Sequence, residues 1–270
     1  MNLAEDDLIN SNSKAQRAQI RRNSLYSNYY TWNLGNYMVK WGDDVRQEQF
    51  AMQMIYEFKS IFEKKKLKLR LTPYEIIPIG PEACLVEMVE EAISLDGLKK
   101  NLQKKYKKKV SLFEFFGSYY KSVKARKKAR TNFCYSLAAY SLLCYFLQLK
   151  DRHNGNILLH RDGRIVHIDF GFLFTTSPGG SIEKSVPFKL VSEYVAVMGD
   201  KLREFEIEFK RGFEAVCEHR ERILSLFRMM AVTAGKPVEC MENTLLAYRE
   251  LEARLNPPRD HKERRKLINL

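Results

Sequence analysis

Two short apolar runs on either side of an Asp-Gly pair constrain the fold of this 270-residue chain most strongly. The runs are residues 157–159 (ILL) and 165–168 (IVHI), with Asp162-Gly163 between them. Glycine accepts the positive φ that a tight turn requires, so an Asp-Gly pair between β-prone runs is a strong hairpin signal. The sequence therefore predicts a β-hairpin in which Asp162 and Gly163 are the two turn residues.

Polar residues flank the open end of this predicted hairpin. With a two-residue turn, Asn156 and Asp169 are directly opposite each other, and cross-strand Cβ atoms are roughly 4.5–5.5 Å apart. Oxygen ligands at that separation suit Mg²⁺, which takes one or two protein ligands and completes its octahedron with phosphate and water. Asp151, Arg152 and His153 precede the first strand at the same end. We therefore expect a metal site and a proton acceptor together.

The turn alone favours a purely structural hairpin, because polar hairpin ends are common in proteins that bind no metal. The residues that flank the hairpin are a more specific signal of function than the turn itself. Residues 151–156 (DRHNGN), followed by 169–171 (DFG), resemble the catalytic loop and DFG element of the phosphatidylinositol 3-/4-kinase superfamily. Ordinary protein kinases have H-R-D-x-x-x-x-N instead. The resemblance implies that the catalytic residues are Asp151, His153, Asn156 and Asp169, and that Asn156 and Asp169 hold the metal.

A second segment, residues 37–48 (YMVKWGDDVRQE), is similar to the same superfamily. There the strand lysine contacts ATP phosphates, and an acidic residue at the end of the G-D-D-x-R-Q-D/E run pairs with it, which implies these roles for Lys40 and Glu48. An ammonium group neutralises phosphate charge, and a carboxylate fixes its rotamer. Without the catalytic hairpin, Lys40 would read as a surface lysine before a turn.

The resemblance also implies an adenine-binding hinge. Residues 85–89 are expected to form a strand that leads into it, and the backbone of Glu87, Met88 and Val89 would pair with adenine. Main-chain recognition leaves little side-chain signature, so this assignment depends mostly on position.

The segment after DFG, residues 171–190, is rich in Ser, Gly and Pro and is expected to be a loop. Its sequence resembles that of phosphatidylinositol 4-kinases of the type III beta class, in which this loop reads the lipid head group. The loop carries few cations, which fits an inositol without extra phosphates. The expected substrate-loop residues are Ser177, Pro178, Gly179, Gly180, Lys184 and Lys189.

These segments predict an α+β, bilobal protein-kinase-like fold, with a small, truncated antiparallel-sheet lobe and a larger, mainly helical lobe. Hydrophobic patterns predict strands within 30–40 and 67–79, a helix from Val45 and a buried helix over 131–149. No glycine-rich phosphate loop is evident upstream of Lys40. The expected divisions are a polar small-lobe remnant (1–24), the small lobe (25–88), the large lobe (89–255) with a basic insert (99–130), and a basic tail (256–270).

The formal charge of +13 favours an anionic partner. Thirteen basic residues lie in 99–130 against the single acid Glu114. This segment reads either as a solvated, partly disordered insert or as an electrostatic foot for anionic lipid, worth ~1 kcal/mol per basic residue near the surface. No recognised nucleic-acid-binding motif accompanies it, so a nucleic-acid partner is not expected.

The five scattered cysteines include no C-x-x-C pair and read as reduced thiols in a cytosolic protein. The first residues have no apolar signal core. The most apolar stretch, residues 133–147, is shorter than the ~20 residues that span a bilayer. We therefore expect a cytoplasmic protein, associated peripherally with intracellular, Golgi-like membranes.

The expected function is transfer of the ATP γ-phosphate to the 4-hydroxyl of phosphatidylinositol, with Mg²⁺, or alternatively Mn²⁺, as the metal. Asp151 and His153 are both candidates for the base, and Asp151 could instead anchor Arg152. One rival is a lipid-kinase-like protein Ser/Thr kinase. Another is a catalytically dead basic module that binds anionic membrane. The sequence indicates no regulator.

Overall fold

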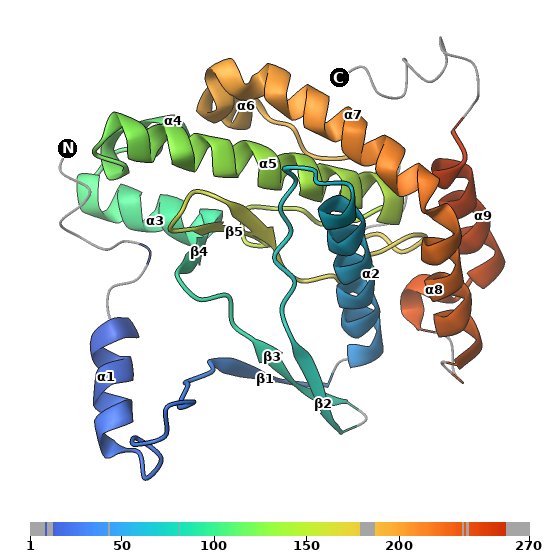
Figure 1. Ribbon diagram of the computed structural model, residues 1–270, viewed down its shortest axis with the longest axis horizontal. Coiled ribbons are helices and arrows are strands. Elements are labelled where there is room, and N and C mark those ends of the chain that lie inside the picture. Colours follow the sequence, from blue (N-terminus) through green and yellow to red (C-terminus); the bar gives the residue numbers. More distant parts are fainter. Residues whose placement is uncertain are drawn as a thin grey trace.

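The structure is a computed structural model that describes Ile9, residues 13–42, 44–80, 82–178 and 187–233, Gly235, and residues 238–257. Figure 1 shows a three-stranded sheet beside α2, and a larger region in which helices surround a second small sheet. The α+β, bilobal architecture expected from the sequence is confirmed. The proposed divisions of the chain stay predictions.

The small lobe is an antiparallel sheet in the order β1-β3-β2, from β1 (Tyr37–Trp41), β2 (Ile76–Gly80) and β3 (Ala83–Glu87). The helix α2 (Val45–Lys64) begins after Asp44, whose carboxylate caps it by accepting the Arg46 N–H. It begins at Val45 as predicted, and its apolar face is buried.

Two of the predicted strands are shorter than expected. The region 30–40 becomes a strand only at Tyr37, because residues 24–32 form successive turns in which Ser27, Tyr29 and Trp32 each donate a backbone N–H to the residue three positions before. The region 67–79 becomes a strand only at Ile76. A short helix, α1 (Ser13–Asn23), precedes the turns in a segment for which no regular structure was expected.

The second sheet contains the predicted hairpin, with a different register. Its order is β4-β5-β6, from β4 (Ala92–Ser94), β5 (Ile157–His160) and β6 (Ile165–His167). Ile157 pairs with His167, and the Ile168 N–H donates to the Asn156 carbonyl at 3.1 Å. Asn156 is therefore opposite Ile168, and the prediction that it faces Asp169 is wrong.

The register differs because the turn has three residues, 161–163, rather than two. The His160 N–H donates to the Arg164 carbonyl at 2.8 Å and closes the loop. The Asp162 carboxylate accepts the Arg164 N–H and lies 2.9 Å from Nδ1 of His160, so it stabilises this longer turn. Gly163 has a φ of +94° and supplies the left-handed position that such a loop needs.

The large lobe is mainly helical (Figure 1). Its central helix, α5 (Val123–Leu147), is buried almost continuously from Asn132 onward, which confirms the buried helix predicted there. It contacts α7, β6 and the smaller helices on both sides. The other helices are α3 (Leu95–Tyr106), α4 (Leu112–Tyr119), α6 (Ser192–Met198), η2 (Gly199–Lys201), α7 (Leu202–Glu218), α8 (Arg220–Thr233), η3 (Glu239–Met241) and α9 (Thr244–Leu255).

The basic segment 99–130 is helical and shares the core of the lobe. It comprises most of α3, all of α4 and the first turns of α5. Phe115 and Phe116 are fully buried, and the Phe116 ring meets Phe133 edge-on with centroids 5.6 Å apart. The interpretation as a partly disordered insert is therefore wrong for this segment. None of the helices in the described ranges is long and apolar enough to cross a membrane.

The hairpin turn generates a stability prediction. We expect Gly163→Ala to lower the free energy of unfolding by more than ~3 kcal/mol, because positive φ costs roughly 1–2 kcal/mol and a Cβ would lie 2.6 Å from the Ala129 carbonyl oxygen. Gly42→Ala is the matched control, since Gly42 has a φ of +91° and a Cβ there would meet no atom within 4 Å. Urea unfolding measures both, and equal losses would contradict the steric argument.

Candidate active site

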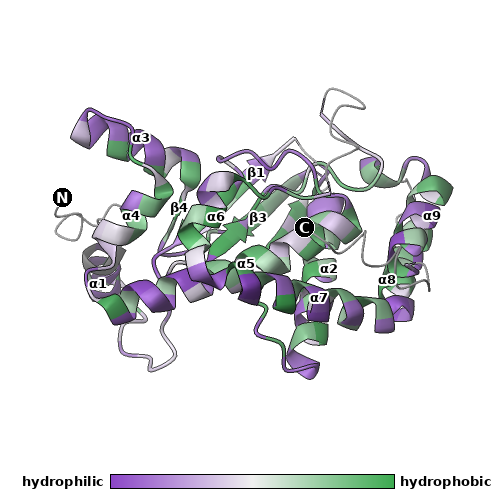
Figure 2. Cartoon of the chain, turned by 90° about the horizontal axis from the view of Figure 1, so that it is seen from above, coloured by the Kyte–Doolittle hydropathy of each residue, from purple (hydrophilic) through white to green (hydrophobic). Residues whose placement is uncertain are grey.

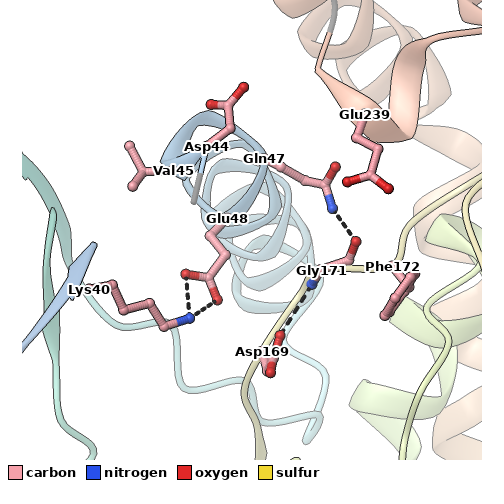
Figure 3. A pocket seen from close by; sticks show the side chains of 9 residues that line it. All are labelled: Lys40, Asp44, Val45, Gln47, Glu48, Asp169, Gly171, Phe172 and Glu239. Atoms are coloured by element: carbon pink, nitrogen blue, oxygen red, sulfur yellow. Dashed lines mark hydrogen bonds and ion pairs between the residues drawn. The ribbon is translucent and has the colours of Figure 1, made fainter. Parts of the chain in front are cut away.

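The Lys40 and Glu48 side chains form an ion pair between β1 and α2. The Lys40 ammonium lies 3.0 and 3.1 Å from the two carboxylate oxygens of Glu48 (Figure 3). The Asp44 cap starts α2 directly beside the strand, which places Glu48 in the first turn of the helix. Only 12% of the Glu48 side chain is exposed, so the pair is shielded from solvent on the carboxylate side. The structure thus brings together the two residues expected at the ATP phosphates.

The Arg152 guanidinium organises the catalytic loop. It is buried and donates to the carbonyls of Lys150, Ile168 and Asp169. The group also lies over the Phe170 ring, 5.5 Å from its centroid. Burial lowers the pKa of Arg152 from its ordinary value. One side chain therefore fixes the segments before and after the hairpin relative to each other.

Asp151, His153 and Asn156 lie together at the start of the hairpin. The Asn156 amide donates to the Asp151 carbonyl at 3.1 Å and to its carboxylate at 3.4 Å. The His153 Nε2 is 3.8 Å from the Asp151 carboxylate, which is beyond hydrogen-bond distance. Because the Asn156 NH₂ group is used in this way, its amide oxygen is the atom available as a metal ligand.

Asp151 and Asp169 both have left-handed backbone conformations, with φ of +59° and +62°. Such conformations are uncommon for residues other than glycine and cluster at functional sites. Asp169 is exposed, whereas the preceding strand residue His167 is buried and stacked on Tyr140 with ring centroids 4.5 Å apart. After His167 the backbone thus turns away from the direction of the strand, and the Asp169 carboxylate is exposed instead of lying on the buried face with His167.

A pocket of about 260 Å³ is bordered by the Lys40–Glu48 pair and by Asp169, whereas Asp151, His153 and Asn156 are not among its lining residues (Figure 3). Its hard oxygen donors fit a divalent metal bound mainly by phosphate and water. In the described part of the chain, no group of three or more His, Cys, Asp or Glu residues could hold a metal ion. The lining residues are Lys40, Asp44, Val45, Gln47, Glu48, Asp169, Gly171, Phe172 and Glu239.

Gln47 is a positioning residue that the sequence analysis missed. Its amide donates to the carbonyls of Phe170 and Gly171, at 3.0 and 2.5 Å, and its oxygen accepts the Cys240 N–H at 3.0 Å. The buried Gln47 thus joins α2, the DFG element and η3. Glu239 was also missed, because it reaches the pocket only through the way in which the chain folds back after α8. The one sequence signal for Gln47 was its position, since it is a polar residue on the apolar face of α2.

The expected hinge residues border a second cavity, of about 460 Å³. The Glu87 N–H donates to the Glu75 carbonyl, and the Met88 N–H to the Asn36 carbonyl, each at 2.8 Å. The Glu87 carboxylate accepts the Glu75 N–H. The N–H groups of Glu87 and Met88 are thus already hydrogen-bonded within the protein. Of the three expected hinge residues, Val89 is therefore the candidate for binding adenine through its backbone N–H.

The substrate loop is anchored at both of its described ends. The buried Lys150 ammonium donates to the carbonyls of Phe174 and Thr176. Lys189 donates to the Arg152 carbonyl at 3.2 Å and to the Asn154 side chain at 3.1 Å. Burial and the charge of Lys99 lower the pKa of Lys189.

Lys189 therefore contacts the catalytic loop instead of pointing into solvent as a head-group cation. Ser177 and Pro178 are half-buried. Gly179, Gly180 and Lys184 lie outside the described residues.

Comparison with known proteins identifies the family. Residues 36–237 match the family described as phosphatidylinositol 3- and 4-kinase. The chain is 39% identical over 236 residues to phosphatidylinositol 4-kinase beta 2 of Arabidopsis thaliana. It is 37% identical over 237 residues to phosphatidylinositol 4-kinase pik1 of Schizosaccharomyces pombe, and 36% over 234 residues to phosphatidylinositol 4-kinase beta of Sorex araneus.

These alignments cover 84%, 83% and 84% of this chain, but 21%, 28% and 28% of the relatives. The chain thus spans about a quarter of the length of the curated relatives it matches. The resemblance of the chain to the superfamily, and to its phosphatidylinositol 4-kinases of the beta class, is confirmed. The chain belongs to the phosphatidylinositol 3- and 4-kinase family.

Proposed function

We propose that this chain transfers the γ-phosphoryl group of ATP to the 4-hydroxyl of phosphatidylinositol. The observation that carries the proposal is a single pocket lined by the Lys40–Glu48 pair and the Asp169 carboxylate, directly beside the D-R-H-x-x-N loop. Membership of the family supports the use of ATP and a divalent metal, and the names of the relatives support phosphatidylinositol as the substrate.

Each residue has a proposed part in binding and orienting the reactants. Lys40 neutralises the phosphates and Glu48 holds its rotamer. Asp169 and the Asn156 amide oxygen would hold Mg²⁺ or Mn²⁺, which supplies charge neutralisation at the transferred phosphoryl group. Val89 is the hinge residue whose backbone N–H would bind adenine.

Asp151 and His153 form the proposed proton-accepting pair. His153 is more exposed, with 59% of its side chain accessible, and its Nδ1 accepts the Gly155 N–H at 3.0 Å. The Asp151 carboxylate accepts from Asn156, so it is positioned by a metal ligand. Acid–base help contributes a modest factor, while positioning and charge neutralisation contribute more.

The substrate would be read by the loop 177–189 at a membrane surface. We propose peripheral association with the cytoplasmic face of intracellular, Golgi-like membranes. Lys189, which the sequence suggested as a head-group contact, is better placed to hold the catalytic loop, because both of its hydrogen-bond acceptors belong to that loop. Lys184 stays a proposed head-group contact.

The first test is phosphate transfer from labelled ATP to phosphatidylinositol in mixed micelles, with the product isomer resolved. We expect the 4-phosphate, and we expect Asp169→Asn to lower kcat by on the order of 100-fold or more, because the amide removes the charge that binds the metal. A different isomer, or faster phosphorylation of a Ser/Thr peptide, would contradict the proposal. Thermal stabilisation by ATP with Mg²⁺ separates a folded kinase from a dead module.

A second prediction concerns Gln47. We expect Gln47→Met to lower the free energy of unfolding by about 2 kcal/mol, because it leaves buried backbone groups without partners. It should also lower kcat by about tenfold through misplacement of the DFG element. The matched control is Gln49→Met on the same helix, which loses a single bond to the Ile76 carbonyl at 3.3 Å and should keep kcat. Equal kcat values for the two variants would argue against a positioning role.

A third prediction concerns Lys189. We expect Lys189→Met to lower kcat by about tenfold while the KM for ATP is kept, and Lys189→Arg to restore part of the activity. Because the pKa of Lys189 is lowered, wild-type activity should fall as the pH rises through that pKa, and the arginine variant should keep its activity to higher pH. The same alkaline limb in both proteins would show that the charge of Lys189 is not involved.

A further inference from the structure

The outer end of the large lobe is strongly and asymmetrically charged. It is formed by α3 from Lys100 onward, α4 with the segments before and after it, and the first turns of α5, and we call it the basic tip. Figure 1 shows α3 and α4 together at one end of the molecule, and three residues join α4 to α5. The exposed lysines of the basic tip are Lys100, Lys104, Lys105, Lys107, Lys108, Lys109, Lys121, Lys124, Lys127 and Lys128.

Acidic residues are few in this part of the sequence. Glu114 is the single acid between Lys99 and Arg130, and its carboxylate accepts from the Ser111 N–H and hydroxyl in a capping box at α4. Asp96 pairs with Lys100 at 2.7 Å. The basic tip therefore has a large excess of basic over acidic residues, which favours an anionic partner.

The shape and composition of the basic tip favour a lipid surface. Lys100 and Lys104 lie on one face of α3, and with Gln103 and with Lys107, which follows the helix, they line a shallow depression of about 410 Å³. Figure 2 shows that α3 projects from the molecule with a largely hydrophilic surface. Two apolar side chains are also exposed here, Phe113 by 51% and Val123 by 79%. Lysines together with exposed apolar groups suit the boundary between head groups and acyl chains.

The basic tip is tied directly to the active site. The first turn of α3 contacts the catalytic loop, where the Asp96 N–H donates to the Asn154 carbonyl at 3.0 Å. Lys100 follows four residues later, only about 6 Å along the helix. Glu193, which follows the substrate loop on α6, bonds both Lys99 at 2.6 Å and the Leu112 N–H at 2.9 Å.

We propose that the basic tip is the surface by which this chain docks on an anionic bilayer. A bilayer bound along the lysine face of α3 would lie next to the catalytic loop and the end of the substrate loop. The choice of a bilayer over other polyanions rests on the proposed function, whose substrate is a lipid. Electrostatic attraction supplies most of the binding, and Phe113 and Val123 add apolar contact.

The test is co-sedimentation of the full chain with phosphatidylcholine vesicles, with and without about one-fifth phosphatidylserine. Binding should require the anionic lipid and should weaken as salt rises from about 0.1 to 0.5 M, since screening shortens the range of the attraction. The variant K104E/K107E/K108E should bind about 100-fold more weakly, at roughly fivefold per lysine.

The control variant K64E/K210E/R249E makes the same change in net charge on α2, α7 and α9, at exposed positions away from the basic tip. It should keep most of the vesicle binding. Equal losses in the two variants would overturn the proposal, because net charge and not the basic tip would then be responsible. Absence of wild-type binding to anionic vesicles would overturn it as well.

Two further measurements separate the alternatives. Tighter binding of a single-stranded RNA than of anionic vesicles at the same salt, lost in K104E/K107E/K108E, would assign the basic tip to nucleic acid and overturn the membrane proposal. Lipid kinase activity is measured separately in neutral detergent micelles, where K104E/K107E/K108E should match wild type. Vesicle binding without kinase activity would leave docking intact and count against the proposed reaction alone.

Discussion

The active site depends on one buried cation. The Arg152 guanidinium donates to three backbone carbonyls that come from both sides of the hairpin. Burying a charge is costly unless it is fully hydrogen-bonded, and here carbonyl oxygens and the face of Phe170 replace water. These bonds hold Asp151 and Asp169 in left-handed conformations that would otherwise be disfavoured. The catalytic geometry therefore follows from a structural residue that does not itself line the pocket.

The helix α2 extends this organisation to the small lobe. Two adjacent residues at its start reach in different directions: Glu48 to Lys40 on β1, and Gln47 to the DFG backbone and η3. A displacement of α2 would therefore disturb Lys40, the DFG element and η3 at once. The Asp44 cap fixes where the helix begins, and so fixes which residues face each partner.

Local patterns predicted the elements of this fold better than they predicted its contacts. The apolar periodicity located the start of α2 and the buried part of α5, and the Asp-Gly pair located the hairpin. The register could not be predicted, because the choice between a two- and a three-residue turn depends on how Asp162 bonds His160 and Arg164. Gln47, Glu239 and the anchoring of Lys189 are contacts between distant segments, and no local pattern encodes them.

The alternation of side chains along β6 explains the backbone at Asp169. Side chains alternate along a strand, so an extended continuation of β6 would place Asp169 on the same face as His167. That face is buried against Tyr140, where an ionised carboxylate would lose its solvation. The strand instead ends at His167, and the positive φ of Asp169 turns its carboxylate into the pocket that contains Lys40. The left-handed backbone at Asp169 is thus a consequence of placing a carboxylate in an open pocket at the end of a buried hairpin.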